Sequence, residues 1–264
     1  MSLNAGLKYA RVLVTAARRG IGFGAAAAFL REGARVVVNS SDPGRLDRAL
    51  ELLRPLGKVS GIPADLGQRE DLDRLLKETR QLLGGLDTLV YVTGSPRPGT
   101  FLEQDFSDWS RAANLLVVSP AYLARGAAEL MTETSRGARQ VFLTSVAIRE
   151  PIPNLATSSV CRIAVAGLVR TLARELGPRG IRVNGILPGY IRTERIDEVA
   201  ADQARRQGTL VSEEISTLER QIPLGRLGTP DELARTILFL GSDLSPYVTG
   251  AMVPVDGGLL RSVG

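Results

Sequence analysis

The regular alternation of short β-branched runs with longer segments of helical periodicity is the strongest constraint on the fold of this chain. The runs are continuously apolar, which is typical of strands covered on both faces. Each connection is long enough to hold a helix, so consecutive strands are expected to lie parallel. We predict strands at Arg11–Thr15, Arg35–Asn39, Lys58–Ile62, Thr88–Val92, Gln140–Thr144, Ile181–Leu187 and Ala251–Val255.

Helical periodicity fills the connections between these runs. We predict helices near residues 21–32, 43–54, 68–83, 107–134, 156–177 and 230–241. No linker rich in glycine, serine or proline divides the chain. The pattern therefore predicts one α/β domain over residues 1–264, with a doubly wound, seven-stranded parallel sheet and helices on both faces.

One long polar segment interrupts the alternation. Residues 193–221 are helical in pattern and follow the end of a predicted strand. Connections of this length within a domain tend to be lids or binding loops. We expect a helical substrate lid at about 193–221, and a peripheral helical ornament is the alternative.

The composition excludes several classes of site. The chain has no histidine, which excludes imidazole zinc ligands and histidine acid–base catalysis, and Cys161 is its only cysteine. We therefore expect no metal site and no internal disulfide. The net charge is +5, but the 33 lysines and arginines are scattered among acidic residues, so we expect no nucleic-acid partner. No apolar run is long enough for a membrane span or signal segment, which predicts a cytoplasmic protein without a membrane partner.

The turn after the first predicted strand contains small residues and opens a helix. It reads Thr15-Ala16-Ala17-Arg18-Arg19-Gly20-Ile21-Gly22. Small residues let the backbone approach a pyrophosphate, and the helix N-terminus supplies unpaired N–H groups and a positive potential. If the turn needs a positive φ at Ala16, alanine costs roughly 1 kcal/mol relative to glycine there. The candidate cofactor-binding residues of this turn are Thr15, Arg18, Arg19, Gly20, Ile21 and Gly22.

The end of the second predicted strand bears on the choice of dinucleotide. An NAD enzyme commonly places a carboxylate here to bind the ribose 2′-hydroxyl, but this chain has Ser40 and Ser41. Arg18 and Arg19 lie on the neighbouring turn, so a 2′-phosphate would meet donors and positive charge. These residues predict NADP(H) in preference to NAD(H). A shifted register that brings the carboxylate of Asp42 to the ribose is the alternative.

These motifs resemble those of the short-chain dehydrogenase/reductase family, Rossmann-type oxidoreductases that move hydride between NAD(P) and a carbonyl or alcohol. Further matches follow in order: Ala64-Asp65-Leu66, a glycine at the end of Tyr91-Val92-Thr93-Gly94, and Pro188-Gly189-Tyr190-Ile191-Arg192-Thr193. The second of these departs from the family's Asn-Asn-Ala-Gly, since only its glycine remains. The resemblance implies further cofactor contacts from Asp65, Leu66, Gly94, Arg162, Pro188, Gly189, Ile191 and Thr193.

The resemblance also locates the catalytic residues, and here the chain departs from the family. The family uses a serine, a tyrosine and a lysine, with an asparagine behind them; Ser145 and Asn114 match two of these. The Tyr-x-x-x-Lys pair falls at Ser158 and Arg162, as in a subgroup similar to β-ketoacyl-[acyl-carrier-protein] reductases that lacks the pair. A serine hydroxyl is a much weaker acid than a phenol of pKa about 10, and an arginine stays charged. Ser158 and Arg162 therefore predict an altered proton relay.

Three functional hypotheses remain open at this stage. The first is an NADP-dependent, 3-oxoacyl-reductase-like oxidoreductase acting on a small carbonyl or alcohol substrate. Tyr190 is its candidate substitute proton donor, although a tyrosine that only packs in the lid is the alternative. The second is a non-catalytic cofactor-binding protein acting as a sensor, scaffold or partner subunit. The third is a pocket that holds an acyl or nucleotide ligand through Arg97, Arg149 and Arg162. The family resemblance also implies a homotetramer formed through the two long helices.

Overall fold

The sheet has seven parallel strands, as the sequence predicts. The computed structural model describes residues 4–132 and 137–262. The strands lie in the order β3-β2-β1-β4-β5-β6-β7, and every neighbouring pair is parallel. Their bounds lie within two residues of those expected. The strands are β1 (Arg11–Val14), β2 (Arg35–Ser40), β3 (Val59–Pro63), β4 (Thr88–Tyr91), β5 (Ala138–Leu143), β6 (Ile181–Pro188) and β7 (Met252–Val255).

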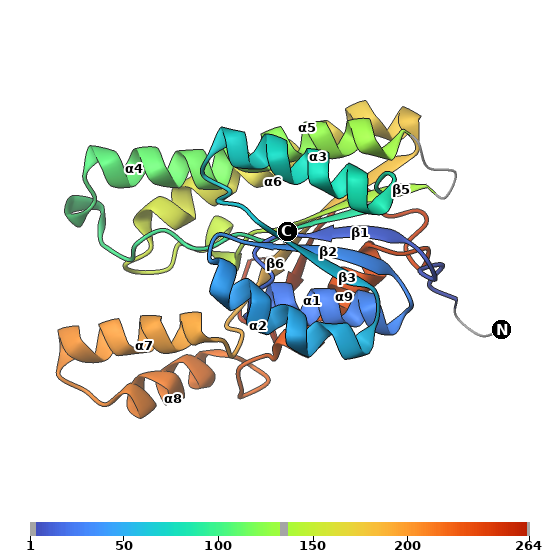
Figure 1. Cartoon of the computed structure of the whole chain (residues 1–264). Coiled ribbons are helices and arrows are strands. Elements are labelled where there is room, and N and C mark those ends of the chain that lie inside the picture. The colour runs from blue at the N-terminus through green and yellow to red at the C-terminus, as the bar shows by residue number, and fades with distance from the viewer. Residues whose placement is uncertain (1–3, 133–136, 263–264) are drawn as a thin grey trace.

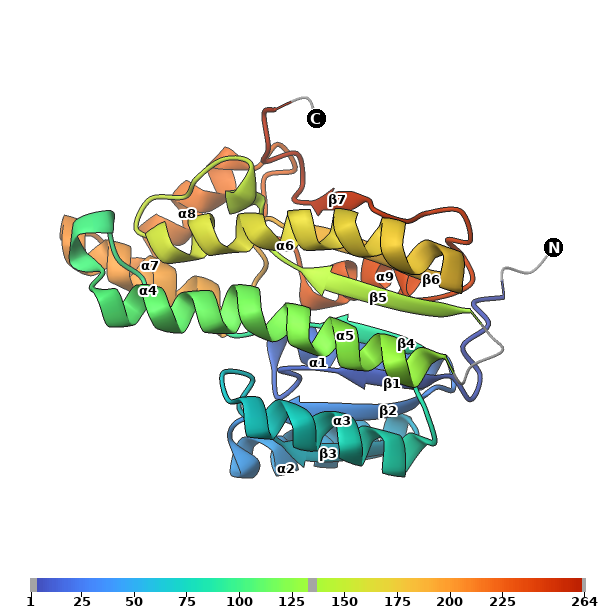
Figure 2. The same ribbon diagram turned by 90° about the horizontal axis from the view of Figure 1, so that it is seen from above.

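Helices cover both faces of this sheet (Figures 1 and 2). One layer contains α1 (Gly20–Arg31), α2 (Pro43–Leu53) and α9 (Pro230–Leu240), and the other contains α3 (Arg69–Leu83), α5 (Ser119–Met131) and α6 (Ala156–Leu176). Strand side chains alternate between the two layers: Val12 and Val14 of β1 belong to one core cluster with Phe29, whereas Leu13 packs in the other with Leu75. Both faces of the sheet are therefore buried, which accounts for the continuous apolar runs in the sequence. Short helical turns occur at η1 (Arg54–Leu56), η2 (Phe101–Glu103), η4 (Val146–Ile148) and η5 (Gly177–Arg179).

The predicted helix over residues 107–134 is present as an unbroken helical run over residues 106–131, but it contains a π-helical segment. The structure has α4 (Phe106–Ala113), a π-helical segment η3 (Asn114–Val118) and then α5; residues 133 and 134 lie outside the described part of the chain. Pro120 stands at the start of α5, where it lacks the N–H that an α-helix would use and its ring crowds the preceding turn. A wider π turn accommodates such a residue.

Among the described residues, one segment, Ala156–Arg179, has the length and composition of a membrane-spanning helix, and it contains α6. This is weak evidence, because the core helix of a folded domain passes the same test. Val165 and Val169 of α6 are buried in the core cluster on the α3–α5–α6 side of the sheet. The apolar character of α6 is thus explained by its packing.

Residues 193–221 form two helices, α7 (Glu194–Gln207) and α8 (Val211–Gln221), which lie to one side of the sheet at left in Figure 1. They share a small apolar cluster that includes Ile196 and Leu218. Gly208, with φ 70°, ends α7 in the left-handed conformation and lets the chain reverse into α8. Ion pairs tie this helical pair to the rest of the protein. Arg192 Nη2 lies 3.0 Å from Glu219 Oε1, and Arg206 Nη1 lies 3.0 Å from Glu103 Oε1.

Candidate active site

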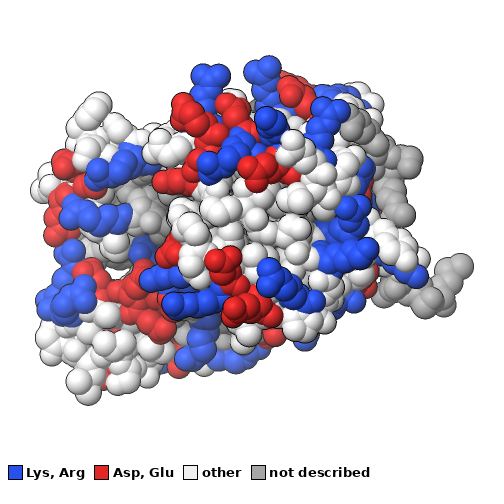
Figure 3. Space-filling model, viewed as in Figure 1, with Lys and Arg blue, Asp and Glu red and all other residues white. Residues whose placement is uncertain are grey.

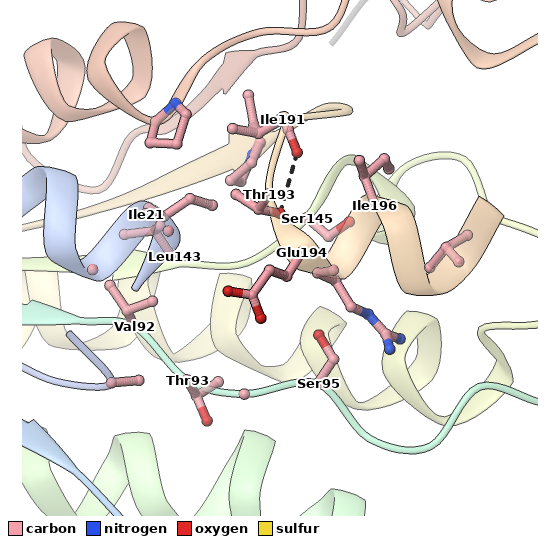
Figure 4. Close-up of a pocket in the computed structure, with 18 of the residues that line it drawn as sticks. Ile21, Val92, Thr93, Ser95, Leu143, Ser145, Ile191, Thr193, Glu194 and Ile196 are labelled. Atoms are coloured by element: carbon pink, nitrogen blue, oxygen red, sulfur yellow. Dashed lines mark hydrogen bonds between the residues drawn. The ribbon is translucent and has the colours of Figure 1, made fainter. Parts of the chain in front are cut away.

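A cavity of about 710 Å³ lies at the carboxyl ends of β1, β4, β5 and β6. Strands β1 and β4 lie side by side in the sheet, and the connections that follow them run to opposite sides, to β2 and to β5. Open α/β sheets bind ligands at such a switch point. Figure 4 shows Ser145 and Thr193 on one side of this space, with Val92 and Thr93 on another. The cavity brings together most of the predicted site residues: Arg18, Arg19, Gly20, Ile21, Gly22, Gly94, Ser145, Ser158, Arg162, Pro188, Gly189, Tyr190, Ile191 and Thr193.

Six predicted site residues do not line this cavity: Thr15, Ser40, Ser41, Asp65, Leu66 and Asn114. Three of them instead tie the surrounding loops together. The hydroxyl of Thr15 donates to the carbonyl of Val92, whose own N–H donates back to the Thr15 hydroxyl at 2.8 Å. Asn114 Nδ2 donates to the carbonyl of Gly67 at 2.6 Å, and Asp65 Oδ1 accepts from the N–H of Gly67 at 2.9 Å. These hydrogen bonds fix the loops around the cavity relative to one another.

Asn39 positions the small-residue turn, and the sequence analysis did not identify it. The N–H of Ala16 donates to Asn39 Oδ1 at 2.9 Å, and Asn39 Nδ2 donates to the carbonyl of Ala64 at 2.7 Å. One amide thus joins the loops that follow β1 and β3. An asparagine at the end of an otherwise apolar, buried strand was the available signal, because a buried amide needs partners.

Ala16 and Gly22 are among the positions of this turn whose conformation or spacing favours glycine. Ala16 has φ 46°, in the left-handed region that L-residues rarely adopt. A Cβ on Gly22 would lie 2.6 Å from the carbonyl oxygen of Ala16, too close for any side chain. The absence of a side chain at Gly22 leaves the backbone accessible where a ligand's phosphates would approach. The positive φ at Ala16 is strained.

We expect Ala16→Gly to raise the free energy of unfolding by about 1 kcal/mol, because glycine adopts a positive φ without the clash of a Cβ. Urea denaturation of the two proteins measures the difference. Ala17→Gly is the matched control; Ala17 is buried and has no positive φ, so its loss of side chain should destabilise the protein. A less stable Ala16→Gly protein would contradict the strain argument.

Arg18 and Arg19 line the cavity beside the small-residue turn, and Arg45 lies near Arg18. Burial lowers the pKa of Arg18, and the charges of Arg19 and Arg45 lower it further. The nearest carboxylate to Arg18 is that of Asp42 at 3.9 Å, but Asp42 also caps α2 by accepting from the N–H of Arg45 at 3.0 Å. Elsewhere the signs are mixed, as the basic and acidic side chains interspersed in Figure 3 show. The carboxylates of Asp42, Glu194 and Glu198 balance these arginines, so a bound anion would take over guanidinium donors that now face carboxylates.

Ser158 and Arg162 form a hydrogen-bonded pair one turn apart on α6. Arg162 Nε donates to Ser158 Oγ at 3.1 Å, and Arg162 Nη2 donates to the carbonyl of Gly94 at 3.3 Å. Burial lowers the pKa of Arg162 to about 10. Because the Ser158 oxygen accepts from a guanidinium, the serine proton is free to be donated to another group. The pair can thus hold a substrate oxygen and stabilise negative charge on it.

Ser145 lies at the end of β5 and presents a second hydroxyl to the cavity (Figure 4). Its Oγ accepts from the N–H of Ala147 at 3.1 Å, which caps η4 and leaves the serine proton available. The hydroxyls of Ser145 and Ser158 therefore come from different elements and line the same cavity.

Tyr190 is half-buried in the cavity wall, and its hydroxyl has no hydrogen bond to any described residue. Burial raises the pKa of this phenol. Its ring packs against the apolar cluster of α7 and α8, so the packing alternative also holds. Tyr91, by contrast, is fully buried, donates to the carbonyl of Leu115 at 2.9 Å and has its pKa raised by burial to about 12. The hydroxyl of Tyr122 is bonded to Asp73.

The fold and the position of this cavity define the class of α/β proteins that bind a dinucleotide at the switch point of a parallel sheet. Residues 15–260 match the family model described as Enoyl-(Acyl carrier protein) reductase. The 3-oxoacyl-[acyl-carrier-protein] reductase of Synechocystis sp. is 31% identical over 251 residues, which cover 94% of this chain and 96% of the relative. The chain belongs to the short-chain dehydrogenase/reductase family.

Two solved structures are similar over nearly the whole chain. L-sorbose reductase from Gluconobacter frateurii, complexed with NADPH and L-sorbose, superposes with a TM-score of 0.93 at 27% identity, covering 99% of this chain and 100% of the other. An NADPH-bound short chain oxidoreductase from Pseudomonas aeruginosa PAO1, described as containing an atypical catalytic center, has a TM-score of 0.85 at 34% identity, with 96% and 98% covered. The family resemblance seen in the sequence is thereby confirmed.

Proposed function

We propose that this protein is an NADP(H)-dependent oxidoreductase that transfers hydride between the nicotinamide and a carbonyl or alcohol substrate, through an altered proton relay. The observation that carries the proposal is the single cavity in which Ser145, Ser158 and Arg162 meet the turn Ala16–Gly22. The family membership and the NADPH-bound structures of similar proteins support it.

The residues of the cavity fit a dinucleotide. A Cβ on Gly94 would meet nothing within 4 Å, so the wall is open there, whereas Gly22 keeps the turn bare. Gly20 and Gly22 would hold the pyrophosphate at the N-terminus of α1, and Thr193 would contact the nicotinamide carboxamide. Arg18 and Arg19 supply positive charge, and position 40 holds a serine where an NAD enzyme commonly has a carboxylate. Both features favour a 2′-phosphate over a free 2′-hydroxyl.

When bound, the nicotinamide supplies the hydride. Ser145 and Ser158 donate hydrogen bonds to the substrate oxygen, and the guanidinium of Arg162, acting through Ser158, stabilises the negative charge that develops there. This arrangement stabilises the alkoxide electrostatically, and the alkoxide must then take up a proton to give the alcohol. Tyr190 is the candidate donor of that proton, because it lines the cavity and its hydroxyl has no hydrogen bond to any described residue.

Helices α7 and α8 are proposed as the substrate lid over residues 193–221 of a single domain. Four aliphatic side chains line the cavity on the lid side: Ile152, Leu155, Ile196 and Val199. Apolar walls favour an apolar substituent next to the reacting carbonyl. This supports a 3-oxoacyl-like or other aliphatic substrate, in keeping with the named activity of the Synechocystis relative.

A homotetramer is part of the proposal. Val118 of η3 is 55% exposed, and Val160 and Ile163 of α6 are 56% and 53% exposed. These aliphatic side chains lie on neighbouring helical segments that pack against each other. An exposed apolar surface of this kind is typical of a contact between symmetric copies.

The competing proposal is a cofactor-binding protein without turnover. Its support is the serine at position 158, since loss of a positioned general acid typically lowers the rate by about 10²–10⁴. Steady hydride transfer to any carbonyl compound would exclude it.

The test is a titration of the protein with NADPH and with NADH, followed by cofactor fluorescence and thermal stabilisation. We expect NADPH to bind about tenfold or more tightly than NADH, because a 2′-phosphate adds charge-assisted hydrogen bonds to arginine. A screen of aliphatic ketones with the preferred cofactor then tests turnover. Binding of neither nucleotide would reject the proposal, and tighter binding of NADH would reject the cofactor preference.

A further inference from the structure

Arg19 reaches across the cavity to α7. This arginine stands at the N-cap of α1, in the turn proposed to bind the cofactor's phosphates. It forms ion pairs with Glu194 and with Glu198, the latter at 3.4 Å between Nη2 and Oε1. Both glutamates line the cavity, and Figure 4 shows the carboxylate of Glu194 pointing into it. The cofactor turn and the lid are therefore joined by charge.

The start of α7 also lies close to the start of α1. A Cβ on Gly20 would be 3.3 Å from the methyl group of Thr193, the residue before Glu194. The N-terminus of a helix attracts anions, and Arg19 adds a positive charge beside it. In this structure the anions at that place are the protein's own carboxylates from α7.

We propose that Glu194 and Glu198 compete with a cofactor phosphate for Arg19 and so lower the affinity of the site for the cofactor. Resting on the proposed function, this inference adds that cofactor binding transfers Arg19 from α7 to the phosphate and releases the first turns of the lid. The far end of α7 stays attached through Arg206 and Glu103. The carboxylates thus lower the affinity for the phosphate and link cofactor binding to the position of the lid.

The test is the dissociation constant of NADPH and of NADH for Glu194→Gln, Glu198→Gln and the double variant. Glutamine keeps the shape and removes the charge. We expect NADPH to bind about three- to tenfold more tightly to the double variant in low salt, with a smaller gain at high salt, since exposed ion pairs are modest and screened. A smaller gain for NADH identifies the 2′-phosphate as the competitor, and an equal gain identifies the pyrophosphate.

Asp197→Asn is the matched control, because Asp197 is exposed on the first turn of α7, carries the same charge and does not line the cavity. Its NADPH affinity should equal that of the wild type. In an Arg19→Gln background, the glutamate substitutions should lose most of their effect, as a double-mutant cycle requires of coupled residues. The proposal would be overturned if Asp197→Asn bound NADPH more tightly by a similar factor, or if the glutamate substitutions still raised the NADPH affinity in the Arg19→Gln background. Either result would show a general effect of charge.

The two proposals fail in different ways. If the wild-type protein binds NADPH and the glutamine variants bind it no more tightly, the competition is refuted and the proposed function stands. If the wild-type protein binds neither nucleotide, both are refuted. Circular dichroism of each variant verifies that α7 remains folded, so that a weaker affinity is also a clear result against the competition.

Discussion

Replacing Ser158 by tyrosine and Arg162 by lysine is expected to raise the turnover number for ketone reduction with NADPH by about 100-fold or more. A positioned general acid contributes typically about 10²–10⁴ in rate, and a phenol is a far better acid than a serine hydroxyl. Position 158 lines the cavity, so a tyrosine placed there projects toward the substrate. A lysine at position 162 can still donate to the carbonyl of Gly94, as Arg162 does. Steady-state kinetics with a panel of aliphatic ketones measures the gain.

Two variants make this result interpretable. Thr171→Tyr places the same side chain on the same helix, but Thr171 is exposed and outside the cavity, so no gain is expected. Arg162→Lys alone leaves the serine in place and should also give no gain. If the double variant binds NADPH as the wild type does and still turns over no faster, position 158 does not face the reacting carbonyl and the altered relay is refuted.

Ser145→Ala is expected to lower the turnover number by about 10²–10³, with little change in NADPH affinity. The loss of one preformed hydrogen bond to a developing oxyanion has this magnitude in other enzymes. Ser145 lies at the end of β5, held as the cap of η4, so its hydroxyl is oriented before substrate arrives. The measurement is the turnover number at saturating ketone, together with the dissociation constant of NADPH.

The alanine variant also loses a helix cap, which costs about 1 kcal/mol of stability and must be separated from catalysis. Ser145→Thr keeps a hydroxyl on the same carbon and should recover most of the activity. Thermal unfolding of both variants shows whether each is folded at the assay temperature. Unchanged turnover in a folded Ser145→Ala protein would remove Ser145 from the reaction and favour the non-catalytic alternative.

The sheet was predictable from sequence because the patterns that define its strands lie within short stretches of the chain. Each strand is a continuous apolar run and each connection holds a helix, and parallel pairing follows from those two facts. The long helix over residues 107–134 was predicted too, but its π-helical segment was not. Pro120 widens the turn at η3, and the surrounding periodicity alone does not reveal that change.

The site was predictable as a set of positions but not as a set of interactions. Chain order and spacing predicted the turn at Gly20, Ser145 and the Ser158–Arg162 pair as candidates, and the structure brings these positions to one cavity. The bond between Ser158 and Arg162 could also be anticipated, since residues four apart share a helix face. Asn39 was missed, because its partners Ala16 and Ala64 are distant in sequence.

The sequence by itself determined the fold class and the family, and it led to the prediction that Ser158 and Arg162 stand in place of a tyrosine–lysine pair. Only the tertiary structure decided that Arg19 meets Glu194 and Glu198, residues that lie about 175 positions further along the chain. It also decided which atoms the guanidinium of Arg162 reaches, because its burial among carbonyl groups leaves Nε to donate to Ser158 Oγ. The physical reason is that motifs record residue types at set spacings, whereas charge pairing and proton direction depend on distances between segments that the chain brings together only on folding.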